Sequence, residues 1–229
     1  MGSQRVILFD IDGTLVETGG AGGESWRRAF AELYDVDADV KLFSEVGETD
    51  PAVGRRTFAG IFGREPEPTD MARLMAVRLS HIRAAVAESS GYLVLPGVEK
   101  TLEQLAANGY LLGLTTGNVE AAGYAKLERG NLNRFFCFGG YGSDSADRGE
   151  LTRVAIRRAA TILGVGVDPG SVMVVGDTPK DVAAAHAAGA ISVAVATGHY
   201  AEEELRMAGA EHVLATLEQP IPGTLGLVA

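Results

Sequence analysis

Residues 6–15 of this chain read Val-Ile-Leu-Phe-Asp-Ile-Asp-Gly-Thr-Leu, and this stretch decides the fold. Four consecutive apolar residues that end at an acidic, glycine-containing turn are typical of a short strand buried on both faces of a parallel sheet. Further apolar runs occur at 110–114, 135–138, 172–175 and 191–196, each followed by a polar or glycine-rich break. The pattern predicts an α/β fold with a Rossmann-like core, in which helices flank a central, mostly parallel sheet.

Helical patterns fill the gaps between most of these runs. The predicted helices cover 98–108, 119–129, 150–163 and 181–188, and a glycine directly follows each of them. Glycine in this position is the usual stop signal, because it adopts the left-handed conformation that closes the last helical turn.

Residues 16–94 interrupt the alternation. They contain no convincing buried strand, but amphipathic helical windows occur at 24–34, 51–62 and 69–88. Glycine-rich and serine-rich stretches at 19–23 and 89–91 flank this block. We therefore expect a helical cap domain at 16–94, joined by two hinges to a core domain made of 1–15 and 95–229. The alternative is that the glycines form a simple loop.

Composition excludes several classes of protein. The chain has 229 residues, with 20 Lys and Arg against 30 Asp and Glu, so its net charge is −10. This acidity argues against nucleic-acid binding, and no apolar run approaches the roughly 20 residues of a membrane span. The single cysteine, Cys137, excludes a disulfide framework and fits a cytoplasmic protein. We expect Cys137 to lie in the core, and the chain to be a monomer or homodimer.

Polar side chains stand at the carboxyl ends of the predicted strands. Asp10 and Asp12 follow the first, Thr116 follows the second, and Asp177 and Asp181 follow the fourth. In open α/β sheets these ends share one crevice, where ligands bind. Carboxylates without nearby cysteine or histidine suit a hard cation such as Mg²⁺.

This arrangement favours phosphoryl transfer. An ionised aspartate can attack a phosphoryl group once a cation and hydrogen-bond donors neutralise the repulsion between them. Gly13 would let the backbone approach the phosphate closely, and the amides of residues 11–13 would form an anion-binding nest.

The ordered motifs resemble those of the haloacid dehalogenase (HAD)-like hydrolase superfamily. Residues 10–15 (DIDGTL) look like its motif I, 114–117 (LTTG) like motif II, and 174–181 (VVGDTPKD) like motif IV. The insertion at 16–94 stands where this superfamily places a C1 cap. The turn Gly47-Glu48-Thr49-Asp50 is similar to a cap loop of the phosphoglycolate phosphatase-like group, which reaches over the active site.

The resemblance implies roles for the matching residues. Asp10 would be the nucleophile and a Mg²⁺ ligand, Asp177 would also hold the metal, and Asp12 would be general acid and then base, with its backbone carbonyl on the metal. Gly13, Thr116, Gly117 and Asn118 would bind the phosphate, with Asp181 and Lys180 in support. Thr116 could instead only cap the following helix, and Asp181 could only complement its dipole.

The residue at the position of Asp12 differs between superfamily members with different activities. Dehalogenases and phosphonate-cleaving members lack an aspartate there, so the resemblance implies a Mg²⁺-dependent phosphatase that acts through an aspartyl-phosphate. The expected partner is a small phosphorylated metabolite similar to phosphoglycolate, and neither nucleic acid nor membrane. A phosphomutase of the β-phosphoglucomutase type and a non-catalytic HAD-fold binding protein remain as alternatives.

The chain departs from the superfamily at motif III, which usually carries a lysine. No lysine lies between 139 and 163. Arg148 is the expected substitute, because a guanidinium can bridge a phosphate and a carboxylate. Arg153 is the second choice and Lys180 the third, and Arg148 could also be an ordinary solvated residue at the start of a helix.

Overall fold

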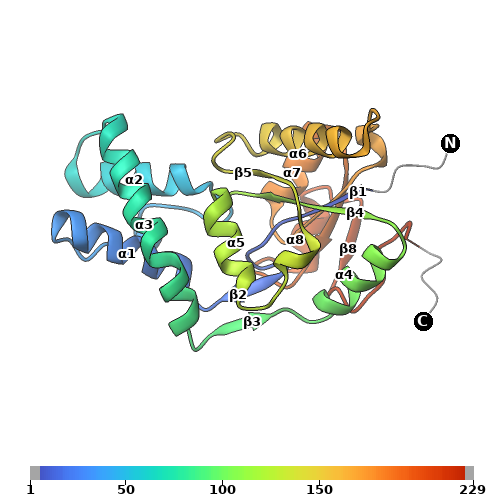
Figure 1. Cartoon of the computed structure of the whole chain (residues 1–229), viewed down its shortest axis with the longest axis horizontal. Helices are drawn as coiled ribbons and strands as arrows, with labels where there is room; N and C mark the ends of the chain where they lie inside the picture. The colour runs from blue at the N-terminus through green and yellow to red at the C-terminus, as the bar shows by residue number, and fades with distance from the viewer. Residues whose placement is uncertain (1–5, 225–229) are drawn as a thin grey trace.

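The computed structural model describes residues 6–224, so the outer ends of the expected core domain, 1–5 and 225–229, lie outside the described residues. A six-stranded sheet forms the centre of the larger part of the molecule (Figure 1). Its strands, in spatial order, are β5 (Gly139–Tyr141), β4 (Leu111–Thr116), β1 (Val6–Phe9), β6 (Met173–Gly176), β7 (Ile191–Val195) and β8 (His212–Leu214). Every neighbouring pair in this sheet is parallel, which confirms the predicted α/β class.

Helices cover both faces of the large sheet. Helices α4 (Val98–Ala107) and α5 (Glu120–Glu128) cover one face, and α6 (Arg148–Leu163) and α7 (Pro179–Ala188) cover the other. In β1, Ile7 and Phe9 pack with the first pair of helices, whereas Val6 and Leu8 pack with the second pair. Successive side chains of a strand point to opposite faces, so a strand buried on both sides is apolar at every position.

Shorter elements complete this part of the chain. Helix α8 (Glu202–Met207) packs near β7 and β8. The 3₁₀ turns are η1 (Val40–Leu42), η2 (Asn133–Phe135) and η3 (Pro169–Ser171). Among the described residues, no helix combines the length and the apolar character needed to cross a membrane.

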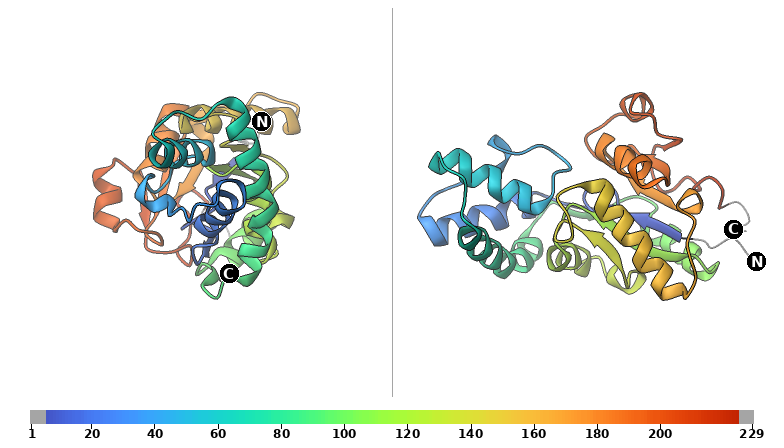
Figure 2. Two further views of the ribbon diagram at one scale, coloured as in Figure 1. Left: turned by 90° about the vertical axis from the view of Figure 1, so that its left-hand side faces the viewer. Right: turned by 90° about the horizontal axis from the view of Figure 1, so that it is seen from above.

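Residues 16–94, which we call the helical insert, leave the sheet after β1 and return before α4. Their helices α1 (Ala21–Tyr34), α2 (Asp50–Phe62) and α3 (Pro68–Glu88) group together beyond one end of the large sheet (Figures 1 and 2). The two connecting segments pair as antiparallel strands, β2 (Val16–Thr18) and β3 (Tyr92–Val94). The insert therefore joins the sheet through two adjacent chains that are hydrogen-bonded to each other.

The prediction of a strand at 135–138 is wrong. Phe135 ends the turn η2, and strand β5 begins only at Gly139. Phe136 and Phe138 are buried, but Cys137 between them is exposed and does not belong to the core. A run of apolar residues indicates burial and not backbone conformation. The edge strand is formed instead by the residues that follow this run, beginning with Gly139 and Gly140.

Three short strands and one helix start were also missed. Strands β2, β3 and β8 have three residues each, which is too short for a recognisable alternation. The glycine run at 19–23 is only partly a connection, because Gly22 and Gly23 lie in the first turn of α1. Gly19 and Gly20 have φ angles of 60° and 85°, a conformation that favours glycine.

Gly140 allows helix α6 to lie directly against strand β5. A Cβ atom at this position would lie 1.8 Å from the carbonyl oxygen of Leu151 and 3.3 Å from the Cβ of Ala155. Both neighbours belong to α6, so a side chain at Gly140 would push the helix away from the sheet.

We expect Gly140→Ala to lower the free energy of unfolding by about 1–3 kcal/mol, the usual cost of overpacking a core. Urea unfolding followed by circular dichroism measures this change. Gly166→Ala is the matched control, because no heavy atom lies within 4 Å of a Cβ built there. An unchanged unfolding midpoint for Gly140→Ala would contradict the close packing of α6 on β5.

Candidate active site

Three buried carboxylates meet at the carboxyl edge of the large sheet. Asp10 follows β1, Asp177 follows β6, and Asp181 lies in the first turn of α7. One oxygen atom from each lies within 4.8 Å of the others, and the residues are 5%, 2% and 3% exposed. Strands β1 and β6 are neighbours in the sheet, which brings positions 10 and 177 together despite their separation in sequence.

Burial and mutual repulsion both oppose ionisation of these groups. Burial, and next the charge of Asp181, raise the pKa of Asp10 to about 7, although Arg148 opposes this rise. Burial, followed by the charges of Asp181 and Asp10, raises the pKa of Asp177 to about 9. A divalent cation would relieve this repulsion, and a donor set of carboxylates without histidine or cysteine fits a hard ion.

Glycines make room for the Asp177 carboxylate. A Cβ atom at Gly198 would lie 1.8 Å from Oδ2 of Asp177, and one at Gly13 would lie 2.3 Å from it. Thr14 Oγ1 donates a hydrogen bond of 3.1 Å to the other oxygen, Oδ1. The turn after β1 thus holds Asp177 by one oxygen, and no hydrogen bond from the described residues reaches the second.

Gly13 has a φ of 76°, which a glycine adopts readily. Its amide donates to the carbonyl of Val16 at 3.0 Å. This amide is therefore already used within the turn, and the anion-binding nest of amides at 11–13 stays a prediction.

Asp181 has two functions in the fold. It forms a capping box with Thr178: Thr178 Oγ1 donates to Asp181 Oδ2 at 2.7 Å, and the Asp181 amide donates to Thr178 Oγ1 at 3.2 Å. Its other oxygen accepts a hydrogen bond from Arg148. Asp181 thus stabilises the start of α7 and also belongs to the carboxylate cluster.

Of the three candidates for the missing motif III lysine, the structure brings only Arg148 to the carboxylates. Arg148 begins α6, and its Nη2 lies 3.5 Å from Oδ2 of Asp10. Its Nη1 donates to the carbonyl of Gly47 in the helical insert at 3.0 Å. The side chain is 10% exposed, so it is not a solvated residue at a helix start.

Arg153 and Lys180 lie elsewhere. Arg153 pairs with Glu150 at 2.8 Å, and its Nη1 also donates to a backbone carbonyl of α7. Lys180 Nζ donates to the carbonyl of Val46 at 2.9 Å, so it contacts the insert and not the carboxylate cluster.

The Asp12 carboxylate has its own set of partners. Lys126 Nζ lies 2.7 Å from its Oδ1 and 2.6 Å from its Oδ2. Asn118 Nδ2 donates to Asp12 Oδ2 at 2.8 Å and to Thr116 Oγ1 at 2.9 Å. Burial alone would raise the pKa of Asp12, but Lys126 and Asn118 outweigh it and lower the pKa below its usual value.

The turn at 47–50 of the helical insert lies against the end of β4. The amide of Asp50 donates to the carbonyl of Gly117 at 2.8 Å. A Cβ atom at Gly117 would lie 2.6 Å from the carbonyl oxygen of Glu48, so this approach requires a glycine. Asp50 Oδ2 also accepts hydrogen bonds from Arg78 Nη1 at 2.7 Å and from the amide of Val119 at 2.8 Å.

A cavity of about 260 Å³ lies between the insert and the sheet edge. Its lining includes Asp10, Asp12, Trp26, Gly47, Glu48, Asp50, Arg78, Thr116, Gly117, Asn118, Lys126, Arg148 and Thr178. Most of the residues singled out from the sequence thus face one space. Sequence analysis missed Arg78 and Lys126 as site residues. Their positive charge was the only signal, and charged residues are common on the exposed faces of packed helices.

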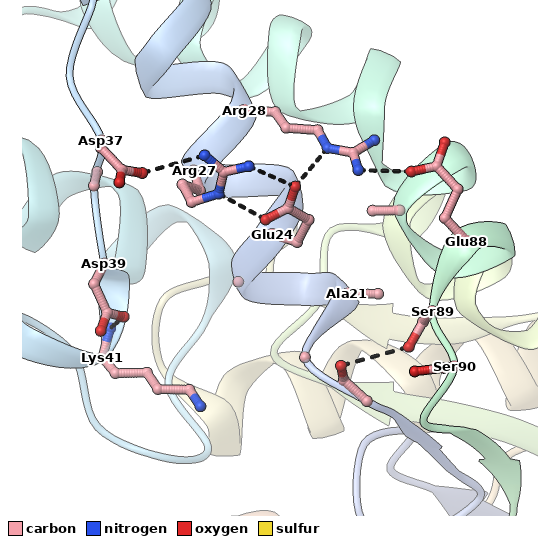
Figure 3. A pocket seen from close by; sticks show the side chains of 15 residues that line it. Ala21, Glu24, Arg27, Arg28, Asp37, Asp39, Lys41, Glu88, Ser89 and Ser90 are labelled. Carbon is pink, nitrogen blue, oxygen red and sulfur yellow. Dashed lines mark hydrogen bonds and ion pairs between the residues drawn. The ribbon is translucent and has the colours of Figure 1, made fainter.

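A larger cavity, of about 660 Å³, lies beside α1 and the end of α3 (Figure 3). Here Glu24 lies between Arg27 and Arg28, and Arg28 also contacts Glu88 of α3 (Figure 3). These charges neutralise one another, and the carboxylate cluster does not line this cavity. The smaller cavity is therefore the candidate active site.

A family model described as haloacid dehalogenase-like hydrolase matches residues 4–189. The chain belongs to the haloacid dehalogenase-like hydrolase family. This confirms the superfamily that the motifs around Asp10, Thr116 and Asp177 indicated.

Named relatives of this HAD-like chain are phosphatases. A phosphoglycolate phosphatase of Rhodospirillum rubrum is 32% identical over 212 residues, which cover 90% of this chain and 85% of the relative. Another, of Agrobacterium fabrum, is 32% identical over 197 residues, which cover 85% and 81% of the two chains. The family and these relatives identify the chain as a phosphohydrolase.

A solved structure shares the whole fold. The crystal structure of CbbY from Rhodobacter sphaeroides in complex with phosphate superposes with a TM-score of 0.73 and 22% identity. The superposition covers 94% of this chain and 96% of that chain. At this level of identity, the likeness establishes the HAD fold.

We expect the stability of the metal-free HAD-like protein to fall as the pH rises from about 4 to about 9. Asp10 and Asp177 have folded pKa values of about 7 and about 9, against 3.8 for an ordinary aspartate. A raised pKa stabilises the fold at low pH, and this contribution is lost as the pH rises through the folded value. Melting temperatures measured in EDTA across this range test the slope, and Asp177→Asn should flatten its upper half.

Adding a divalent cation should raise the melting temperature, and more so at higher pH, because the ion binds the ionised carboxylates. Glu203→Gln, an exposed change on α8, is the control and should leave both effects unaltered. A melting temperature that ignores Mg²⁺ and Mn²⁺ over the whole pH range would contradict a metal site here.

Proposed function

We propose that this chain is a Mg²⁺-dependent phosphatase that hydrolyses a small phosphomonoester through an aspartyl-phosphate on Asp10. The observation that supports it is the cluster of Asp10, Asp177 and Asp181 beside Arg148, in which Asp10 and Arg148 line the 260 Å³ cavity. Asp10, Asp177 and the backbone carbonyl of Asp12 would hold the ion, with Asp181 in support. Mg²⁺ would neutralise charge between the phosphoryl group and the attacking carboxylate.

In the proposed reaction, Asp10 acts as the nucleophile and Asp12 transfers the protons. In the first step, a carboxylate oxygen of Asp10 forms a bond to phosphorus while the bond from phosphorus to the ester oxygen breaks. Asp12 supplies the proton to the leaving oxygen. In the second step, Asp12 accepts the proton of an attacking water, phosphate leaves, and the Asp10 carboxylate is restored. The lowered pKa leaves Asp12 ionised in the free site, so the proton that it gives to the leaving oxygen would be taken up when the ester binds.

Donors near Asp10 would bind the phosphoryl oxygens. The Thr116 hydroxyl and the Asn118 amide lie at the end of β4 and line the cavity, with Gly117 between them. Arg148 would take the place of the motif III lysine, since its guanidinium already faces Asp10 and has a buried Nε without a hydrogen-bond partner in the described chain. Lys180 would act only indirectly, through its contact with Val46.

We assign residues 16–94 as a C1-type cap and residues 1–15 and 95–229 as the core. Contacts of the insert across the cavity support this division: the carbonyl of Gly47 accepts from Arg148, and the amide of Asp50 donates to Gly117. A cap held over the carboxylates would exclude bulk water during the first step.

The substrate would carry a carboxylate close to its phosphate, as phosphoglycolate does. Arg78 of α3 lines the cavity from the insert side and is 1% exposed. Its Nη1 donates to Asp50, but its Nε has no hydrogen-bond partner among residues 6–224. Its guanidinium lies 4.7 Å from the ring of Trp26, which fixes its plane. A second anionic group on the substrate would use the remaining donors.

Asp10→Asn should abolish phosphate release from p-nitrophenyl phosphate, because an amide cannot form the acyl phosphate. The native chain should lose this activity in EDTA and regain it with Mg²⁺, as a colorimetric phosphate assay measures. Asp35→Asn, at an exposed aspartate after α1, is the matched control and should keep full activity. Activity that survives Asp10→Asn or EDTA would refute the mechanism.

Arg78→Met should lower kcat/KM for phosphoglycolate by about 10-fold or more, the usual worth of a hydrogen bond to a charged group. Ethyl phosphate, which has no carboxylate, should lose less than about 3-fold by the same reasoning. Arg78→Lys is the control, because it keeps a positive charge beside Asp50. Equal losses on the two esters would show that Arg78 stabilises the insert and does not bind the substrate.

A further inference from the structure

Lys126 is a buried cation to which the motifs assign no role. It lies on α5 and is 5% exposed, whereas Lys41 and Lys100 are exposed and Lys180 is half-buried. A lysine is rarely buried unless it is paired, because its ammonium loses hydration. Its acidic partner is Asp12, with both carboxylate oxygens within 2.7 Å of Nζ.

The surroundings hold the Lys126 side chain in one place. The carbonyl of Lys126 accepts a hydrogen bond of 3.0 Å from Tyr92 Oη, which ties α5 to strand β3. Ala122 and Ala125 of the same helix pack against α3 of the insert. Gly22, in the first turn of α1, faces the ammonium: a Cβ atom there would lie 3.5 Å from Nζ. The ammonium therefore lies where α5, α1 and the turn after β1 meet.

Asp12 in turn has little freedom. Lys126 contacts both of its oxygens, and Asn118 Nδ2 donates to one of them while also bonding to Thr116. Asp12, Asn118 and Lys126 all line the 260 Å³ cavity. Two side chains thus fix the direction in which the Asp12 carboxylate faces this cavity.

Lys126 also changes the charge of the site. Asp10, Asp12, Asp177 and Asp181 provide four carboxylates, and Arg148 and a divalent ion offset three of those charges if all four are ionised. Lys126 offsets the fourth, so these four carboxylates would present no net negative charge to an anionic ester.

We propose that Lys126 is a positioning residue for the reaction, which holds the Asp12 carboxylate at the leaving oxygen and compensates its charge. This inference rests on the proposed function, in which Asp12 exchanges a proton with the leaving oxygen and then with water. Lys126 acts through Asp12 and forms no bond to the substrate.

The experiment compares Lys126→Met, Asp12→Asn and the double variant on two esters. Phosphoglycolate has an alkoxide leaving group that needs a proton, whereas p-nitrophenolate leaves readily without one. Lys126→Met should lower kcat for phosphoglycolate by about 100-fold, the usual contribution of a general acid, with KM nearly unchanged. In the first turnover, before the water attack that is common to both esters, the release of p-nitrophenolate should be slowed much less than the release of glycolate, and Asp12→Asn should show the same contrast.

The double variant should be no slower than Asp12→Asn alone, because both changes remove one function. Lys126→Arg should restore part of the activity on phosphoglycolate, and Lys100→Met, at an exposed lysine, should change nothing. If Lys126→Met does not fold, Lys126→Arg still tests the idea: its misplaced charge should lower the ratio of alkyl to aryl turnover.

Equal first-turnover losses on the two esters, or additive losses in the double variant, would overturn the role of Lys126. Those results differ from a failure of the proposed function, in which the native chain would release no EDTA-sensitive phosphate from either ester. In that case the inference falls with the function on which it rests.

Discussion

The repulsion among buried carboxylates at one edge of the sheet is the constraint on which this structure depends. Asp10, Asp177 and Asp181 lie within 4.8 Å of one another, and burial removes the water that would screen them. The fold tolerates this because hydrogen bonds from Thr14 and Thr178 hold two of the carboxylates, and Arg148 supplies a charge. The negative charge that remains on the carboxylates is the charge that a divalent cation would compensate.

Arg148 connects this cluster to the helical insert. One nitrogen of its guanidinium faces Asp10 and Asp181, while another donates to the carbonyl of Gly47. A lysine has a single nitrogen and could not make both contacts with the same geometry. The arginine in place of the motif III lysine therefore links the position of the loop around Gly47 to the carboxylate that receives the phosphoryl group.

The cations around the cavity are each matched to an aspartate. Lys126 pairs with Asp12 and Arg78 with Asp50, and both cations are buried beside the cavity. Separating either pair would leave a buried charge without a partner, which is costly. Asp50 also bonds to Gly117 and Val119, so the partner of Arg78 helps to hold the insert against the end of β4.

The sequence by itself determined the α/β class, the existence of strands β1, β4 and β6, and the motif residues Asp10 and Asp177, because buried strands must be apolar and their ends carry the polar groups. It did not locate β5 at Gly139–Tyr141, since a run of apolar residues marks burial and not an extended backbone. Only the tertiary structure decided which cations reach the site. Lys126 and Arg148 are far from Asp12 and Asp10 in the chain, and their contacts depend on how α5 and α6 pack on the sheet.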